Sequence, residues 1–194
     1  MSHFFIGVFV PANLREDQVE AKIEALMEPY SENLEVEMHE EPCWCLTLEA
    51  DSKLSPPPVV CEQCNGTGKY ETTSNPNSHW DWYVIGGRWD GEIQGKRRDD
   101  GQGGFNFDDE HHQVEYNSMQ VKDLLKDLPT EVLDTLTGER GLFCPRALVT
   151  PDGEWHEKTD SEFFGKSSDH WEKEVFELLQ KYREYNIIGV DCHV

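Results

Sequence analysis

The sequence predicts an α+β fold of the ferredoxin-like type, a two-layer sandwich in which two β-α-β units build a sheet with helices on one face. Strand-like and helix-like patterns alternate over residues 1–39, and the same order returns over residues 142–194. Residues 40–117 show little helical periodicity and are rich in Pro, Gly, Asn and Asp. For a chain of 194 residues we therefore expect one domain with a long insertion. An open α/β arrangement is the alternative.

The first unit starts with residues 4–10, which are apolar on both faces, as is typical of a central strand. Asn13 followed by Glu16 indicates a helix start of the capping-box type, and apolar residues then recur at helical spacing up to Tyr30. Residues 34–38 alternate between apolar residues and glutamate, which predicts a half-exposed strand.

The second unit follows a predicted helical linker over residues 118–141. A Pro-Asp-Gly turn at 151–153 predicts a hairpin, and Asp169 with Glu172 three residues later predicts a second capped helix. Residues 187–194 read as a closing strand. Right-handed crossovers would bring the first and last strands into one sheet.

Composition excludes several classes of function. The formal net charge of -22 argues against direct binding to nucleic acid or to an anionic membrane, since both need a basic surface. No apolar run reaches membrane-spanning length, and no signal-like segment precedes the first strand, so we expect a cytoplasmic protein. Six cysteines, with two closely spaced pairs, favour a metal site over disulfides.

The two cysteine pairs carry the strongest local motif. Residues 61–68 (CEQCNGTG) place glycines behind two cysteines, a turn in which backbone amides can approach a thiolate. Residues 43–45 (CWC) supply a second pair, and His39 is a spare ligand. The predicted ligands of one structural zinc ion are Cys43, Cys45, Cys61 and Cys64. The alternative is a loop with free thiols. Residues 61–68 resemble one repeat of the zinc module of DnaJ-type chaperones, whose second repeat is absent here.

Residues 75–91 contain three of the six tryptophans, a Gly-Gly pair and one arginine. Alternation places Trp80 and Trp82 on one face of an extended segment. In one interpretation this is a hairpin whose aromatic residues fill the core. In the other it is a pocket wall, in which an arginine binds a carboxylate or phosphate. The predicted ligand-binding residues are Asp81, Trp82, Tyr83, Arg88, Trp89 and Trp155.

The last strand offers a second constellation. Asp191 and His193 are two residues apart and hence share a face, on the side of the first strand that carries His3 and Phe5. With His156 they would supply two imidazoles and one carboxylate, which can bind zinc or iron or act as a general base. The predicted catalytic residues are His156, Asp191 and His193. The alternative is a solvated chain end.

Three segments together resemble a family of uncharacterised proteins encoded by bacteriophages and actinobacteria. They are residues 75–89 (NPNSHWDWYVIGGRW), 150–156 (TPDGEWH) and 190–193 (VDCH). The resemblance covers most of the chain. It implies a phage or bacterial cytoplasmic origin and transfers no catalytic residue.

We expect a zinc-stabilised protein that binds a small polar or anionic ligand, such as a nucleotide, between an open sheet face and the insertion. In a phage, this could sequester a nucleotide signal. One alternative is a metal-assisted hydrolase that uses His156, Asp191 and His193. Another is an acidic interaction protein that occupies the nucleic-acid-binding site of a host protein.

Overall fold

The computed structural model describes residues 2–43, 45, 61–94, 114–115, 117–127, 145–158 and 169–194. Within this part of the chain, no helix has the length and apolar character needed to cross a membrane. Three predicted segments lie wholly or partly outside the described residues. They are the extended linker at 55–58, the loop at 96–104, and residues 128–141 of the helical linker predicted over 118–141.

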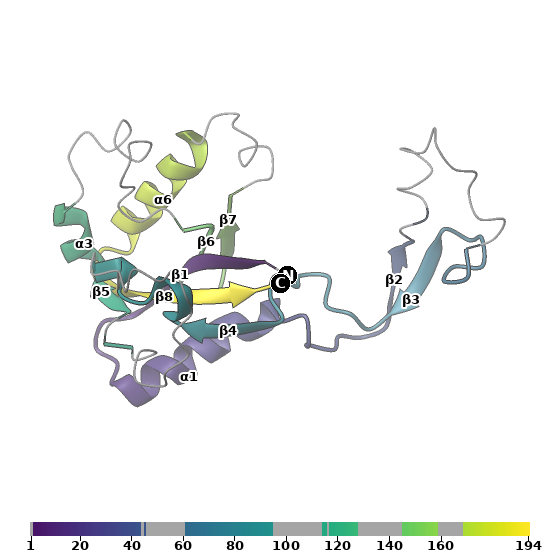
Figure 1. The fold of residues 1–194 in the computed structure, drawn as a ribbon, viewed down its shortest axis with the longest axis horizontal. Coiled ribbons are helices and arrows are strands. Elements are labelled where there is room, and N and C mark those ends of the chain that lie inside the picture. Colours follow the sequence, from purple (N-terminus) through teal and green to yellow (C-terminus); the bar gives the residue numbers. More distant parts are fainter. Residues whose placement is uncertain are drawn as a thin grey trace.

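A six-stranded, mostly antiparallel sheet forms the body of the protein, with strand order β4-β8-β1-β6-β7 (Figure 1). β5 pairs with the other half of β8, on the same side as β4. β1 and β8 pair along all nine residues, and β6 runs parallel to β1. The strands are β1 (His3–Pro11), β4 (Trp82–Ile85), β5 (Ser118–Gln120), β6 (Ala147–Val149), β7 (Trp155–Glu157) and β8 (Tyr185–His193). The prediction that the first and last strands lie in one sheet is confirmed, and in the structure they are direct neighbours.

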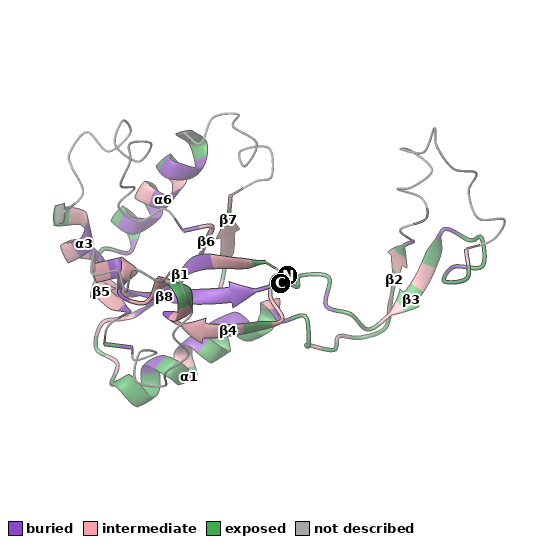
Figure 2. Cartoon of the chain, viewed as in Figure 1, coloured by how far each residue is buried: buried purple, intermediate pink, exposed green. Residues whose placement is uncertain are grey.

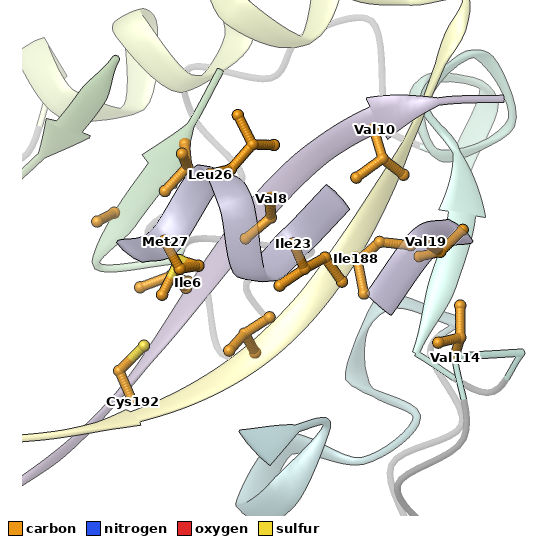
Figure 3. Close-up of a cluster of buried hydrophobic side chains, with 13 residues drawn as sticks. Ile6, Val8, Val10, Val19, Ile23, Leu26, Met27, Val114, Ile188 and Cys192 are labelled. Carbon is orange, nitrogen blue, oxygen red and sulfur yellow. The ribbon is translucent and has the colours of Figure 1, made fainter. Parts of the chain in front are cut away.

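Helices cover both faces of this sheet. α1 (Glu16–Met27) packs on one face, while α3 (Val121–Asp127) and α6 (Asp169–Lys181) pack on the other. Successive β1 residues supply the two cores, because side chains alternate along a strand. Ile6 and Val8 lie against α1 (Figure 3), and Phe5 and Phe9 belong to the core of α6.

The fold is therefore α+β, but the ferredoxin-like sandwich with helices on one face is not confirmed. β1 is apolar on both sides, so each face needs a covering layer to remove these side chains from water. The open sheet face that we expected is in large part occupied by α6.

The first predicted β-α-β unit differs from the structure in two places. α1 starts at Glu16, and the N-cap is Arg15, whose backbone N–H donates to Gln18 Oε1 at 3.1 Å, so the predicted Asn13 cap is wrong. Residues 34–38 form no strand; β2 (His39–Pro42) pairs with β3 (Lys69–Thr72) in a separate two-stranded sheet.

This second sheet belongs to a segment that projects from the body (Figure 1), and we call its described residues, 31–43, 45 and 61–80, the arm. At its base, Glu32 N–H donates to Trp80 O at 2.7 Å, and the buried Asn75 side chain donates to Pro29 O and Ser31 O. Figure 2 shows mostly exposed and intermediate residues along the arm. Cys43 and Cys64 are its buried apolar residues among those described.

Candidate metal centre and ligand site

The four predicted cysteine ligands meet at one end of the β2–β3 hairpin. All four Sγ atoms lie within 4.8 Å of one another, and the cysteines form no disulfide. Sγ of Cys43 is 3.5 Å from that of Cys61, and Sγ of Cys45 is 3.6 Å from that of Cys64. Tetrahedral zinc with Zn–S bonds of about 2.3 Å would place its sulfur atoms about 3.8 Å apart. The cluster therefore has the composition and spacing of a site that could hold one metal ion.

The turn after Cys61 shapes this cluster. Asn65, Gly66 and Gly68 have φ values of 50°, 80° and 76°, in the left-handed region that glycine favours. Burial raises the pKa of Cys64, but backbone N–H groups of Gly68 and Gly66 and the neighbouring thiols outweigh it and lower this pKa to about 7. Amides that stabilise a thiolate in this way also suit a metal-bound sulfur.

His39, the spare ligand, is not part of the cysteine cluster. Its Nε2 lies 3.1 Å from Glu41 Oε1, and its Nδ1 lies 3.1 Å from the backbone oxygen of Glu37. Among the described residues, the candidate metal centre therefore consists of cysteines alone.

A second constellation lies where the chain ends meet, at the edge of the sheet formed by β4. His3 Nδ1 is 2.9 Å from Asp191 Oδ1, and His193 Nδ1 is 2.7 Å from Asp81 Oδ1. We call His3, Asp81, Trp82, Asp191 and His193 the paired-histidine site. Its five residues come from β1, β4 with the residue before it, and β8, so the sheet register alone brings them together.

Both carboxylates in this site are held by further contacts. Asp191 is only 3% exposed, and its Oδ2 accepts the backbone N–H of Arg88 at 3.0 Å. Asp81 Oδ1 accepts the backbone N–H of Trp82 at 2.8 Å. Burial raises the pKa of Asp81, but its hydrogen bonds with His193 and Trp82 outweigh this effect and lower the pKa. The ionised carboxylate is therefore favoured beside the imidazole.

Trp82 covers the two imidazoles. Its ring stacks on His193, with centroids 5.0 Å apart and planes 15° apart, and meets His3 edge to face at 5.1 Å. His193 is 6% exposed, whereas Trp82 is 37% exposed. Trp82 therefore presents a flat aromatic surface to solvent above two oriented imidazoles.

The other predicted ligand-binding residues do not share one pocket. Arg88 and Trp89 lie in the short helix η2 (Gly87–Trp89), where Trp89 stacks on Phe5 in the core of α6. Tyr83 and Trp155 pack on the opposite face, with the core of α1. Side chains alternate across a strand, so Trp82 and Tyr83 cannot line the same side.

Trp155 takes part in a separate aromatic group at the base of the arm. His79 lies flat on its ring at 4.5 Å, and Tyr30 approaches it at 5.0 Å. The Trp155 Nε1–H donates to Glu157 Oε2 at 3.1 Å. This group joins the arm to the β6–β7 hairpin. On its outer side, Nδ1 of His79 lies 3.4 Å from Oε2 of Glu157.

The structure does not bring His156 to Asp191 and His193. His156 lies in β7, three strands away from β8, or roughly 14 Å at about 4.8 Å per strand. Its Nδ1 lies 2.8 Å from Glu174 Oε1 in α6.

His3 occupies the place that we assigned to His156. Alternation along the first strand predicts that His3 lies on the face of Asp191 and His193, but its position near the start of the strand does not mark it as a site residue. The signal that could have identified it is the antiparallel pairing of the two end strands, which sets His3 opposite His193.

Each imidazole in the paired-histidine site has one nitrogen held by a carboxylate, which orients the ring for proton transfer, for metal binding or for contact with an anion. A purely structural reading is that the two pairs fasten the chain ends together. Comparison of the chain with protein-family models, curated proteins and solved structures found no match.

Proposed function

We propose that this is a zinc-stabilised cytoplasmic protein, encoded by a phage or a bacterium, that binds a small anionic ligand with a flat ring, such as a nucleotide. The ligand would bind at the paired-histidine site. The observation that carries this proposal is the stacking of the half-exposed Trp82 on a buried, carboxylate-held His193. Aromatic side chains exposed in this way are typical stacking surfaces for bases.

Arg88 supports the anionic character of the ligand. Its backbone N–H donates to Asp191 Oδ2 at 3.0 Å, so the backbone of Arg88 lies beside the paired-histidine site, and its side chain is exposed. From this position the side chain could extend to a bound carboxylate or phosphate and form two parallel hydrogen bonds with it.

The zinc ion would have a structural role. Four cysteines complete a tetrahedral shell and leave no position for a substrate, as in closed structural sites. A two-stranded hairpin is marginally stable by itself in water, and the arm has few buried apolar side chains among its described residues. Metal binding would therefore supply the stabilisation that this hairpin lacks.

A hydrolase that uses His156, Asp191 and His193 is less well supported, because His156 lies three strands away.

The test is a titration of the full-length protein with AMP, ATP and a cyclic nucleotide, followed by native mass spectrometry and tryptophan fluorescence. Base stacking contributes about 1–3 kcal/mol, so Trp82→Leu should weaken binding by roughly 5- to 150-fold. Trp155→Leu is the matched control, because Trp155 lies on the other face of the sheet. Equal affinities for both variants, or no binding of any nucleotide to the wild type, would remove the proposed site.

A further inference from the structure

We infer that His3 and His193 form a binding site for a divalent transition metal ion, separate from the four-cysteine centre. The two imidazoles would be its protein ligands, and water or an anionic ligand would occupy the remaining positions. The site coincides with the proposed ligand site, but metal binding does not require that ligand.

The register of the end strands places the two rings side by side. Ser2 and Val194 exchange both backbone hydrogen bonds, at 2.8 and 3.0 Å. The next pair, His3 and His193, is therefore a non-hydrogen-bonded pair, in which opposite side chains approach more closely. Both side chains lie on one face of the sheet, and their ring centroids are 4.9 Å apart.

This ring separation fits a shared metal ion. Imidazole nitrogen binds zinc at about 2.0–2.1 Å, so two rings at a tetrahedral angle have centres roughly 5 Å apart. The centroids of His3 and His193 are 4.9 Å apart, with ring planes 76° apart, so their separation is close to this value. Imidazole ligands suit zinc, copper, iron and nickel.

The carboxylates identify which nitrogen would bind the metal. Asp191 holds Nδ1 of His3 and Asp81 holds Nδ1 of His193, so the Nε2 atom of each ring is directed away from its carboxylate. Metal-binding histidines nearly always have their second nitrogen on a carboxylate or a carbonyl in this manner. Here both members of the pair show the arrangement, and Asp191 is itself held by the backbone N–H of Arg88.

A metal ion would also reduce the repulsion between the proposed anionic ligand and the carboxylates of the site. Asp81 and Asp191 are acidic, and the chain has a net charge of -22, so an anionic ligand approaching Trp82 meets a negative environment. A divalent cation between the imidazoles would offset these charges and could accept an oxygen of the ligand directly.

The first experiment measures zinc stoichiometry by native mass spectrometry of the full chain, with zinc in excess. We expect two ions per wild-type chain, one in His3→Gln, and two in the control His156→Gln, whose histidine lies on β7 against Glu174. Asp191→Asn should weaken binding of the second ion by about 10- to 100-fold, as is usual for loss of a carboxylate behind a histidine ligand. One ion in the wild type, or two in a folded His3→Gln variant, would overturn the inference.

A second measurement needs no variant. After zinc has filled the cysteine centre, Co²⁺ is added and the imidazole NMR signals are followed. We expect paramagnetic shifts at His3 and His193 and none at His156. Shifts confined to any other histidine would refute the site.

The same samples separate this inference from the proposed function. If the second ion binds but AMP does not bind with or without it, the metal site stands and the ligand proposal fails. If AMP binds equally with and without excess zinc, and the wild type never takes up a second ion, the ligand proposal stands and the metal site fails.

Discussion

Replacement of Gly87 by alanine tests the geometry on which the paired-histidine site depends. Gly87 has a φ of +54°, and a Cβ atom placed on it would lie 2.5 Å from Cβ and 2.6 Å from Oδ2 of Asp191. No real contact is this short, so either the turn or Asp191 must move. Asp191 holds His3 and accepts the backbone N–H of Arg88, so any displacement disturbs the site.

The size of the effect follows from two costs. A left-handed backbone conformation costs alanine about 1–2 kcal/mol relative to glycine. Loss of a hydrogen bond to a charged group costs about 1.5–3 kcal/mol, and Asp191 is too buried for water to replace the bond freely. Gly87→Ala should therefore lower the free energy of unfolding by about 2.5–5 kcal/mol.

The chain contains a matched control. Gly153 also has a positive φ, +90°, but the nearest atom to its added Cβ is Leu26 Cδ2 at 3.9 Å, an ordinary van der Waals contact. Gly153→Ala should therefore show the backbone cost alone, about 1–2 kcal/mol. Urea unfolding of both variants, followed by far-UV circular dichroism, gives the difference, which we expect to be about 2 kcal/mol.

Equal destabilisation of the two variants would refute the reasoning, because it would show that Gly87 does not contact Asp191 as closely as the structure indicates. Binding provides a second readout. Gly87→Ala should also weaken zinc binding at the second site, whereas Gly153→Ala should leave it unchanged. A Gly87→Ala variant with two zinc ions at wild-type affinity would contradict the role of Asp191 in orienting His3.

Three further predictions concern the rest of the molecule. Removal of the metal by a chelator should abolish hydrogen-exchange protection of the β2–β3 amides but not of β1 and β8, because the sheet has its own cores; equal loss in both sheets would contradict this. Cys192 should resist thiol reagents in the folded protein, as seen by mass spectrometry of the modified peptides, because it is fully buried and burial raises its pKa well above the usual value. The pKa of His79 is lowered from 6.5, mainly by burial and further by the charge of Arg146, while the charge of Glu157 opposes the shift. The unfolded chain therefore binds the proton first, and stability should fall as the pH drops below about 6.5. The melting temperature of His79→Phe should show a smaller decrease between pH 7.5 and 5.5 than that of the wild type, and an equal decrease would contradict this contribution.

Several elements followed directly from residue patterns. The apolar residues of the two main helices are buried as their spacing predicts: Val19, Ile23, Leu26 and Met27 in α1, and Trp171, Val175, Leu178 and Leu179 in α6, with Tyr182 directly after its last residue. The turn at 151–153 forms, with Gly153 at positive φ. The four cysteines converge because the two members of each pair are close in sequence, and the pairing of β2 with β3 brings the two pairs together.

The prediction of the active site was wrong because it identified the strands but not their order in the sheet. Alternation correctly placed Asp191, His193 and His3 on one face of the sheet, but it contained no information on the distance of His156 across the strands. The prediction of a shared pocket was also wrong, because it did not take into account which face of the sheet each aromatic residue occupies. Trp82 and Trp155 were grouped by composition, although they lie on opposite faces.

The sequence alone determined which side of each helix is buried, that β1 is a central strand, and that a four-cysteine cluster is available for a metal. These properties depend on periodicity and on spacing within short segments. Only the tertiary structure decided that α1 and α6 lie on opposite faces and that His3 lies beside His193. A strand that is apolar on both sides accepts a helix on either face, and the partner of an imidazole is set by sheet register, which joins residues at opposite ends of the chain.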